Sequence, residues 1–219
     1  MITVLNKSNS LFNTYLSEVR DEHIQKDSFR FRWNMERMGS IFAYEISKQM
    51  EFSVREVHTP FGIAVEHVIT QQPVTISVLR AGLPIHHGVL NFFDCAEGGF
   101  ISMSRDYDKK GNLQKNLEYI SCPCLNEKDV ILCDAVIASG ASMSLAYKSL
   151  LSKGTPKHIH LIALIASREG LTSLRKKLPS KGVSLWLGAL DDELTAKSFI
   201  VPGMGDAGDL AYGAKESDS

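Results

Sequence analysis

The sequence of 219 residues has little cysteine, and none of its apolar runs is long. Its four cysteines include Cys122 and Cys124, a pair spaced wrongly for a zinc knuckle and without the second pair that a tetrahedral site needs. We therefore expect ordinary reduced thiols. No segment has the length and apolarity of a signal peptide or a transmembrane helix. We expect a cytoplasmic protein without a membrane partner.

The chain also has little net charge, because 24 Lys and Arg residues oppose 25 Asp and Glu residues, for a net charge of −1. Such a balance provides no bulk attraction for nucleic acid, so no nucleic-acid partner is expected. Any anion must be bound by a local group of donors. A hydrophobic content of 44% excludes a disordered chain. We expect one domain over residues 1–219.

A long amphipathic helix is predicted at residues 27–50, where apolar residues recur every three or four positions. Asp27 or Ser28 is expected to cap its start. Basic residues beside the apolar stripe are interpreted as a solvated face. These are Arg30, Arg32, Arg37 and Lys48.

After this helix, short apolar segments rich in β-branched residues alternate with helical segments. Apolar runs of this length are typical of parallel strands that are buried on both faces. The alternation predicts an α/β fold with an open, mainly parallel sheet flanked by helices. Strands are predicted at 74–79, 129–134, 158–166 and 183–190, helices at 84–93, 142–151 and 169–178, and a β-hairpin arm at 100–125.

Open parallel sheets bind ligands at the carboxyl ends of their strands, and three of these ends carry unusual loops. The first loop, residues 79–83, places Arg80 on a turn of small residues before a helix. Small residues let backbone N–H groups approach an anion, and an arginine can bind two phosphate oxygens. The alternative is a tight strand–helix turn with an exposed arginine.

The second loop, residues 133–142, follows a buried strand with an acid and then small residues that open a helix. Helix N–H groups and the hydroxyls of Ser139 and Ser142 would surround a phosphate-sized site. Asp134 would accept bonds from sugar hydroxyls or help to hold a divalent ion. No Gly-Lys-Ser/Thr follows, so this is not the nucleoside-triphosphate P-loop. The alternative is a serine-capped helix.

The third loop, residues 199–209, contains three glycines and two aspartates around an apolar opening. Irregular backbone of this kind can recognise the flat hydrogen-bonding edge of a nucleobase. The acids are too few for a calcium loop. The alternative is a plain glycine-rich turn.

Together the three loops resemble those of the uracil phosphoribosyltransferases, within the type I phosphoribosyltransferase family. The resemblance runs from about Phe29 to Gly213, and its most specific stretch is 201–209. It implies transfer of the phosphoribosyl group of 5-phosphoribosyl-1-pyrophosphate (PRPP) to uracil, which gives uridine monophosphate (UMP) and pyrophosphate in pyrimidine salvage. It further implies Mg²⁺ as cofactor, a homodimer or homotetramer, and a base-binding element at 191–213.

Carried over residue by residue, the resemblance implies catalytic roles for Arg80, Asp134 and Asp206. The implied PRPP-binding residues are Arg80, Arg105, Asp134, Ala135, Val136, Ile137, Ala138, Ser139, Gly140, Ala141, Ser142 and Asp206. The implied uracil-binding residues are Ile200, Gly205, Asp206 and Ala207. No side chain is assigned as a direct metal ligand, although Asp134 could act through the ribose or through water. His86 and His87 are interpreted as helix residues.

The chain departs from the family pattern at several positions of these loops. In the phosphate loop Ala135 replaces a proline, Ser139 a threonine and Ala141 a glycine. The methyl of Ala141 matters only if that position needs a positive φ. Two further departures are Phe199 in place of tyrosine and Leu210 in place of a basic residue.

Two alternatives for the function stay open: a non-enzymatic regulator that senses uridine nucleotides and binds RNA, and a phosphoribosyltransferase for another base.

Overall fold

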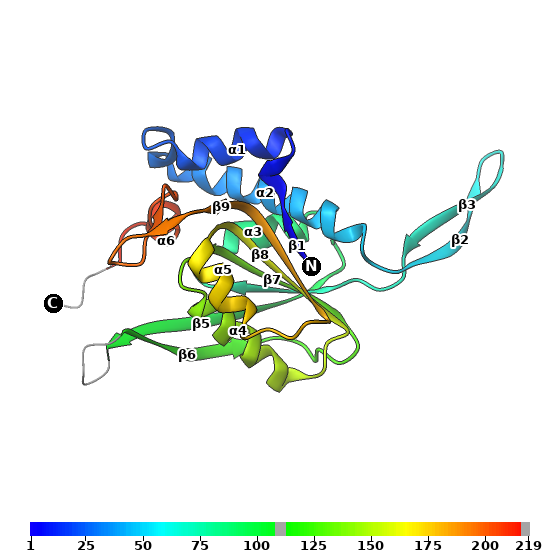
Figure 1. The fold of residues 1–219 in the computed structure, drawn as a ribbon. Helices are drawn as coiled ribbons and strands as arrows, with labels where there is room; N and C mark the ends of the chain where they lie inside the picture. The colour runs from blue at the N-terminus through cyan, green and yellow to red at the C-terminus, as the bar shows by residue number, and fades with distance from the viewer. Residues whose placement is uncertain (108–112, 216–219) are drawn as a thin grey trace.

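The computed structural model describes residues 1–107 and 113–215, with the backbone alone described at 105–107 and 113–115. A seven-stranded sheet forms the centre of the molecule (Figure 1). Its strands are β1 (Ile2–Val4), β4 (Val74–Val78), β5 (Glu97–Tyr107), β6 (Leu113–Ser121), β7 (Asp129–Ile137), β8 (His158–Ser167) and β9 (Val183–Asp191).

The strand order in this sheet is β1-β9-β8-β7-β4-β5-β6. Neighbouring strands are parallel except β5 and β6, which form the antiparallel arm. The predicted open, mainly parallel sheet is therefore confirmed. β4 is buried along its whole length, and so are nearly all residues of β8. A strand covered on both faces needs apolar residues on both, which explains the continuous apolar runs of the sequence.

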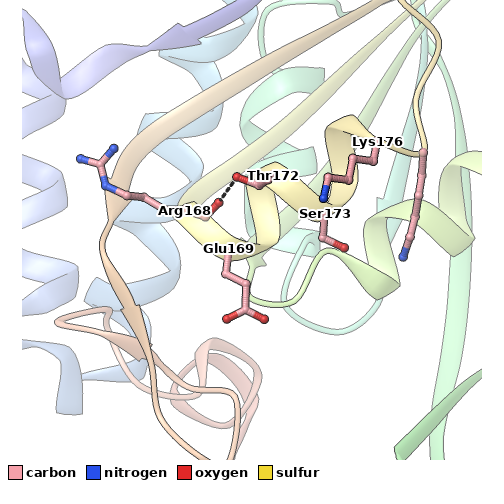
Figure 2. A pocket seen from close by; sticks show the side chains of 6 residues that line it. Arg168, Glu169, Thr172, Ser173 and Lys176 are labelled. Carbon is pink, nitrogen blue, oxygen red and sulfur yellow. Dashed lines mark hydrogen bonds between the residues drawn. The ribbon is translucent and has the colours of Figure 1, made fainter.

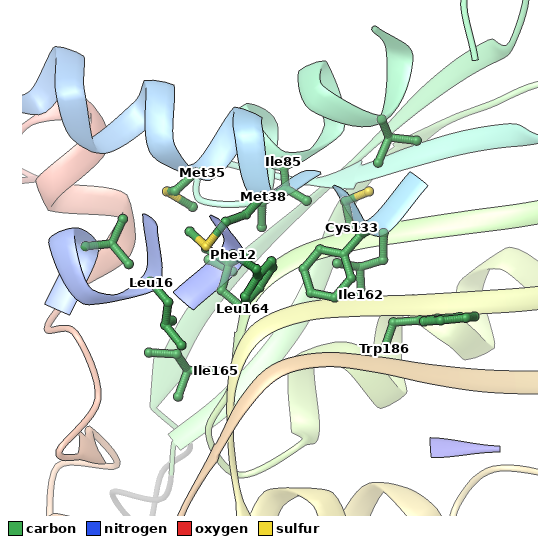
Figure 3. Packing of buried hydrophobic residues seen from close by; sticks show 14 of the residues in the cluster. Phe12, Leu16, Met35, Met38, Ile85, Cys133, Ile162, Leu164, Ile165 and Trp186 are labelled. Atoms are coloured by element: carbon green, nitrogen blue, oxygen red, sulfur yellow. The ribbon is translucent and has the colours of Figure 1, made fainter. Parts of the chain in front are cut away.

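Helices cover the two faces of the sheet (Figure 1). Two hydrophobic clusters lie between the helices and the sheet, and Figure 3 shows residues of one of them. Successive residues of a strand point to opposite faces. In β7, Ile131 and Cys133 pack with α1, α2 and α3, whereas Val130 and Leu132 pack with α4 on the other face. The helices are α1 (Leu11–Arg20), α2 (Ser28–Ser47), α3 (Leu83–Leu90), α4 (Ala141–Leu150), α5 (Arg168–Arg175) and α6 (Ala207–Tyr212), with short 3-10 helices η1 (Leu5–Lys7), η2 (Ile24–Lys26) and η3 (Leu151–Lys153).

The long helix α2 begins as predicted, because the Asp27 carboxylate accepts from the N–H groups of Phe29 and Arg30. It ends at Ser47 rather than at residue 50. The last residues form a turn, in which the Met50 N–H donates to the Ser47 carbonyl. The predicted end was therefore three residues too late, although Met50 is still buried.

The basic residues of α2 are only partly a solvated face. Arg30 and Lys48 are exposed and pair with nearby glutamates. Arg32 instead donates to the Ala211 carbonyl at 2.6 Å and lies over the Tyr212 ring. It thereby ties α2 to the C-terminal helix α6. Arg37 lies over the rings of two aromatic side chains of α1 and α2.

A second hairpin stands away from the body of the molecule (Figure 1). It consists of β2 (Phe52–Thr59) and β3 (Gly62–Ile69), which pair only with one another among the described strands. Every residue of β2 is exposed. The sequence analysis predicted no element in this stretch, and it also missed β1 and α1. A third, two-stranded sheet joins β10 (Glu193–Leu194) to β11 (Ile200–Val201).

Several other predicted boundaries need correction. The helix predicted at 84–93 ends at Leu90, the helix predicted at 169–178 ends at Arg175, and the arm begins at Glu97 rather than at residue 100. The loop of the arm, at residues 108–112, lies outside the described residues. Within the described part of the chain, no helix has the length and apolarity needed to cross a membrane.

Candidate active site

The three predicted loops line one cavity of about 640 Å³. The first and second loops meet because they follow β4 and β7, which are parallel neighbours whose carboxyl ends lie at the same edge of the sheet. The arm contributes Met103, Ser104 and Glu118 to the wall. The wall also includes residues 78–81, Asp134, 136–143, 197–200, 203–208 and Lys215.

The cavity brings together nearly all of the residues that the sequence resemblance implied. Ala135 is an exception, because its side chain is fully buried in the hydrophobic cluster of α2 rather than in the cavity wall. Arg105 lies in β5, and its side chain falls outside the description.

The first loop turns sharply after β4. Gly82 is required there, since a Cβ at this position would lie 2.7 Å from the Val78 carbonyl oxygen and would collide with that of Cys133. The Leu79–Arg80 peptide bond is cis. Arg80 Nη2 donates to Asp209 Oδ1 at 2.7 Å, and Nη1 donates to the Gly213 carbonyl at 3.1 Å. Arg80 is therefore bound to α6 and is not a freely exposed arginine.

The second loop is shorter than predicted. β7 continues past Asp134, because Val136 and Ile137 pair with β8, and only residues 138–140 connect the strand to α4. Asp134 is buried at the end of this strand, and its Oδ1 accepts from the Ala135 N–H at 2.7 Å. The carboxylate is thus held by its own backbone at the edge of the cavity.

Gly140 is the residue that turns the chain into α4. Its φ is 76°, a left-handed value that favours glycine, and a Cβ there would lie 2.7 Å from the Gly170 carbonyl oxygen. Ala141 is not among the residues with positive φ, so its methyl group causes no backbone strain. Since no side chain caps α4, the alternative of a serine-capped helix is wrong. The N–H groups at the start of α4 are therefore not taken by a capping side chain.

The third loop ends in a capped helix. Asp206 Oδ1 accepts from the N–H groups of Gly208 and Asp209 at 2.9 and 3.1 Å, which begins α6. Gly203 and Gly205 have φ values of 58° and 84°. Ile200 is buried. The loop is therefore an ordered structure beside the cavity and not a plain turn.

Two residues that the sequence analysis did not single out hold this loop. Asp191, at the end of β9, accepts from the Gly203 N–H at 2.9 Å. Arg20, at the end of α1, binds both Asp191 oxygens at 2.8 and 2.7 Å and also donates to the Gly203 carbonyl. Burial raises the pKa of Asp191, but the bonds from Arg20 and Gly203 outweigh it and lower the pKa. No local pattern links residues so distant in sequence.

The histidines of α3 do not line the cavity. His86 is buried, and its Nε2 lies 2.9 Å from the Thr75 hydroxyl. Burial lowers the pKa of His86, and the hydrogen bond of Nε2 to the Thr75 backbone carbonyl opposes that shift only in part. Both His86 and His87 are helix residues, as interpreted.

A second hollow, of about 430 Å³, runs along α5 (Figure 2). Its wall contains Arg168, Thr172 and Lys176, and the Thr172 hydroxyl donates to the Arg168 carbonyl of its own helix. None of the residues predicted for substrate lines it. We therefore assign the chemistry to the larger cavity.

The cavity offers oxygen ligands rather than a closed metal cage. Asp134 and Asp206 are the aspartates in its wall. In the part of the chain that the structure describes, no group of three or more His, Cys, Asp and Glu residues could hold a metal ion. The two aspartates in the wall fit Mg²⁺, which keeps several waters and is bound by one or two carboxylates together with substrate phosphates.

A mainly parallel sheet with an arginine turn, a helix that begins at a glycine and a glycine-rich loop around one cavity is the arrangement expected of a phosphoribosyltransferase. The chain is thus a transferase. A sequence model described as uracil phosphoribosyltransferase matches residues 6–214, and the chain belongs to that family.

Individual proteins agree with this assignment. A uracil phosphoribosyltransferase of Porphyromonas gingivalis is 47% identical over 211 residues, which cover 96% of this chain and 97% of the relative. One of Pyrococcus furiosus is 34% identical, over 90% of this chain and 84% of the relative. The solved structure of the AQ2163 protein from Aquifex aeolicus is similar with a TM-score of 0.85 and 27% identity, over 99% of this chain and 100% of that one.

Proposed function

We propose that the chain transfers the phosphoribosyl group of PRPP to uracil and so produces UMP and pyrophosphate, a reaction of pyrimidine salvage. One observation carries the proposal: in a chain of this family, the three loops meet around one cavity of about 640 Å³.

The chemistry explains why such a cavity needs these residues. Breaking the bond at C1 of the ribose leaves a cationic sugar and a departing pyrophosphate. Catalysis then consists mainly of stabilising a growing anion and of positioning uracil, which is a poor nucleophile. Arg80 supplies positive charge at the cavity edge, and backbone N–H groups at the start of α4 suit the 5′-phosphate.

The remaining residues divide between the two substrates. Asp134 accepts bonds from the ribose hydroxyls, and Arg105 of the arm contacts the donor. Asp206 lies between the donor and the base. Ile200, Gly205 and Ala207 present backbone groups to the uracil edge. Residues 136–142 form the remaining contacts to PRPP.

Asp134 would help to hold Mg²⁺, through the ribose or through water. A bound Mg²⁺ would supply positive charge for the leaving pyrophosphate. This assignment is supported by the oxygen-rich wall of the cavity and by the buried, backbone-held carboxylate of Asp134.

A homodimer or homotetramer is also proposed. The support is the β2–β3 hairpin, whose Val54, Ile63 and Val65 side chains are 63%, 59% and 61% exposed. A monomer would leave these apolar side chains in water. A cytoplasmic location and the lack of a nucleic-acid partner stay predictions of the sequence.

The direct test incubates the purified protein with labelled uracil, PRPP and Mg²⁺ and measures UMP by chromatography. UMP formation that requires all three supports the proposal. If other bases are converted faster than uracil in a competition assay, the enzyme acts on another base. Failure to form any nucleotide, combined with salt-dependent retention of RNA, would instead indicate the regulator.

A further inference from the structure

The guanidinium of Arg80 is shared between the cavity and the C-terminal helix. Arg80 lines the cavity, but both of its terminal nitrogens are bonded to the α6 segment, Nη2 to Asp209 and Nη1 to the Gly213 carbonyl. Its Nε is buried and has no hydrogen-bond partner among the described residues. This nitrogen lies on the α6 side of the guanidinium, since a Cβ at Gly208 would be 3.9 Å from it.

Asp209 lies behind this arginine and not in the cavity wall. Its own backbone N–H donates to Asp206 Oδ1, the carboxylate that caps α6 and lines the cavity. Asp209 thus connects the arginine of the donor loop to the loop that is proposed to bind the base.

Gly208 lies beside the arginine and the Asp206 carboxylate. A Cβ there would lie 3.3 Å from Asp206 Oδ1 and 3.6 Å from Arg80 Nη2. The arginine therefore packs directly against the first turn of α6. An alanine Cβ would be in ordinary contact with the guanidinium and would crowd only the Asp206 carboxylate.

We propose that Asp209 is a positioning residue that fixes the Arg80 guanidinium against α6, so that its positive charge is held beside the cavity for the pyrophosphate group of PRPP. The inference rests on the proposed function, and it adds a residue that acts through Arg80 without touching substrate. A charged arginine that is held in place before the ligand arrives loses less freedom on binding. Without Asp209, the side chain has to be ordered by the pyrophosphate itself.

The test compares Asp209→Ala and Asp209→Asn with the wild-type protein. Loss of one charge-assisted bond should raise the KM for PRPP about tenfold in Asp209→Ala, with the KM for uracil and kcat changed less than twofold. Asp209→Asn keeps an acceptor oxygen and should give an intermediate KM. Calorimetric binding of pyrophosphate to the enzyme without other substrates should weaken by a similar factor.

Glu45→Gln is the matched control, because Glu45 accepts from Lys48 at 2.7 Å in an exposed ion pair of α2, far from the cavity wall. It should leave both KM values unchanged. Thermal unfolding of each variant shows whether the fold is retained.

Three results would overturn the inference. An equal rise in both KM values would mean that Asp209 only maintains α6, and unchanged values would mean that it does nothing for the donor. Tighter binding of pyrophosphate would mean that Asp209 competes with the ligand for Arg80. If the wild-type protein makes no UMP, the proposed function fails, but the pyrophosphate titration still decides the role of Asp209.

Discussion

Arg20 and Asp191 form a two-bond ion pair that joins the end of α1 to the end of β9, with N–O distances of 2.8 and 2.7 Å. Both also bind Gly203, Arg20 through the carbonyl and Asp191 through the N–H. The backbone of the third loop is thus held from both sides at one residue. This pair sets where the proposed uracil-binding backbone lies.

Arg20→Ala should destabilise the protein by about 2 kcal/mol, because it leaves the buried Asp191 carboxylate with one bond fewer on each oxygen. The partial exposure of Arg20 keeps this cost below that of breaking a fully buried pair. The KM for uracil should rise more than the KM for PRPP. Urea unfolding and steady-state kinetics measure the two effects. Arg30→Ala, which breaks an exposed ion pair with Glu18, is the control and should change neither the stability nor the KM for uracil. If Arg30→Ala reduces the stability and raises the KM for uracil as much as Arg20→Ala does, Arg20 has no particular role in holding the third loop.

Gly140→Ala should weaken the start of α4, because a Cβ at a φ of 76° would also lie 2.7 Å from the Gly170 carbonyl oxygen. Strain alone costs about 1 kcal/mol, and the clash adds to it. Gly182→Ala is the matched control, since its φ is also 76° but nothing lies within 4 Å. Chemical unfolding should show a larger loss for Gly140→Ala, and the KM for PRPP should rise only there. Equal losses in the two variants would mean that strain, and not the contact, decides.

Stability should fall as the pH drops below about 6.5. Burial lowers the pKa of His160 from 6.5 to about 3, and His158 beside it adds to the shift. The unfolded chain then binds one more proton than the folded chain between these values, so the free energy of unfolding decreases by about 1.4 kcal/mol per pH unit as acid is added. Below a pH of about 3 both states are protonated and the slope from this group ends.

Urea unfolding between pH 7.5 and pH 4.5 measures this slope. His160→Gln, which offers Trp186 Nε1 an acceptor in place of His160 Nδ1, should show a shallower slope whatever its absolute stability. A slope as steep as that of the wild-type protein would assign the acid sensitivity to other groups. Asp191 acts at lower pH, because its lowered pKa preserves its contribution until the pH falls through that value.

Arg80→Ala and Asp134→Asn should each reduce kcat/KM by about a hundredfold or more, which is typical for loss of one group that stabilises developing charge. Asp134→Asn should leave the fold intact, since an amide oxygen can still accept from the Ala135 N–H. Steady-state kinetics and circular dichroism test both points. Arg175→Ala, an exposed residue of α5, is the control. Wild-type rates in either site variant would refute its assigned role.

Much of the site could be predicted from sequence because each loop is local. Buried strands such as β4 and β7 have mostly apolar sequences, which predict strands directly. The loop residues that follow each strand are adjacent in the chain, so the sequence shows them together. The end of β7 was placed too early because Asp134 is polar. Pairing of Ile137 with Ala166 in β8 extends the strand beyond it, and this pairing is a tertiary effect.

Other parts depend on contacts that a local pattern does not show. The Arg20–Asp191 pair joins residues 171 positions apart, and the Arg80–Asp209 pair joins residues 129 apart. β1 is only three residues long and exists because it pairs with β9. The β2–β3 hairpin was missed because charged residues and histidines interrupt its apolar residues, and most of its residues are exposed in the protomer.

The register of that hairpin leads to the last prediction. Val54 pairs with His67 and Val65 with Glu56, so both valines project from the same face, together with Ile63. Val54→Lys with Val65→Lys should convert the proposed homodimer or homotetramer to a smaller species, because burying two charges in an apolar contact is unfavourable. Analytical ultracentrifugation measures the mass. Glu66→Lys, on the opposite face, is the control. If the double variant keeps the mass of the wild-type protein, this face of the hairpin is not the subunit contact.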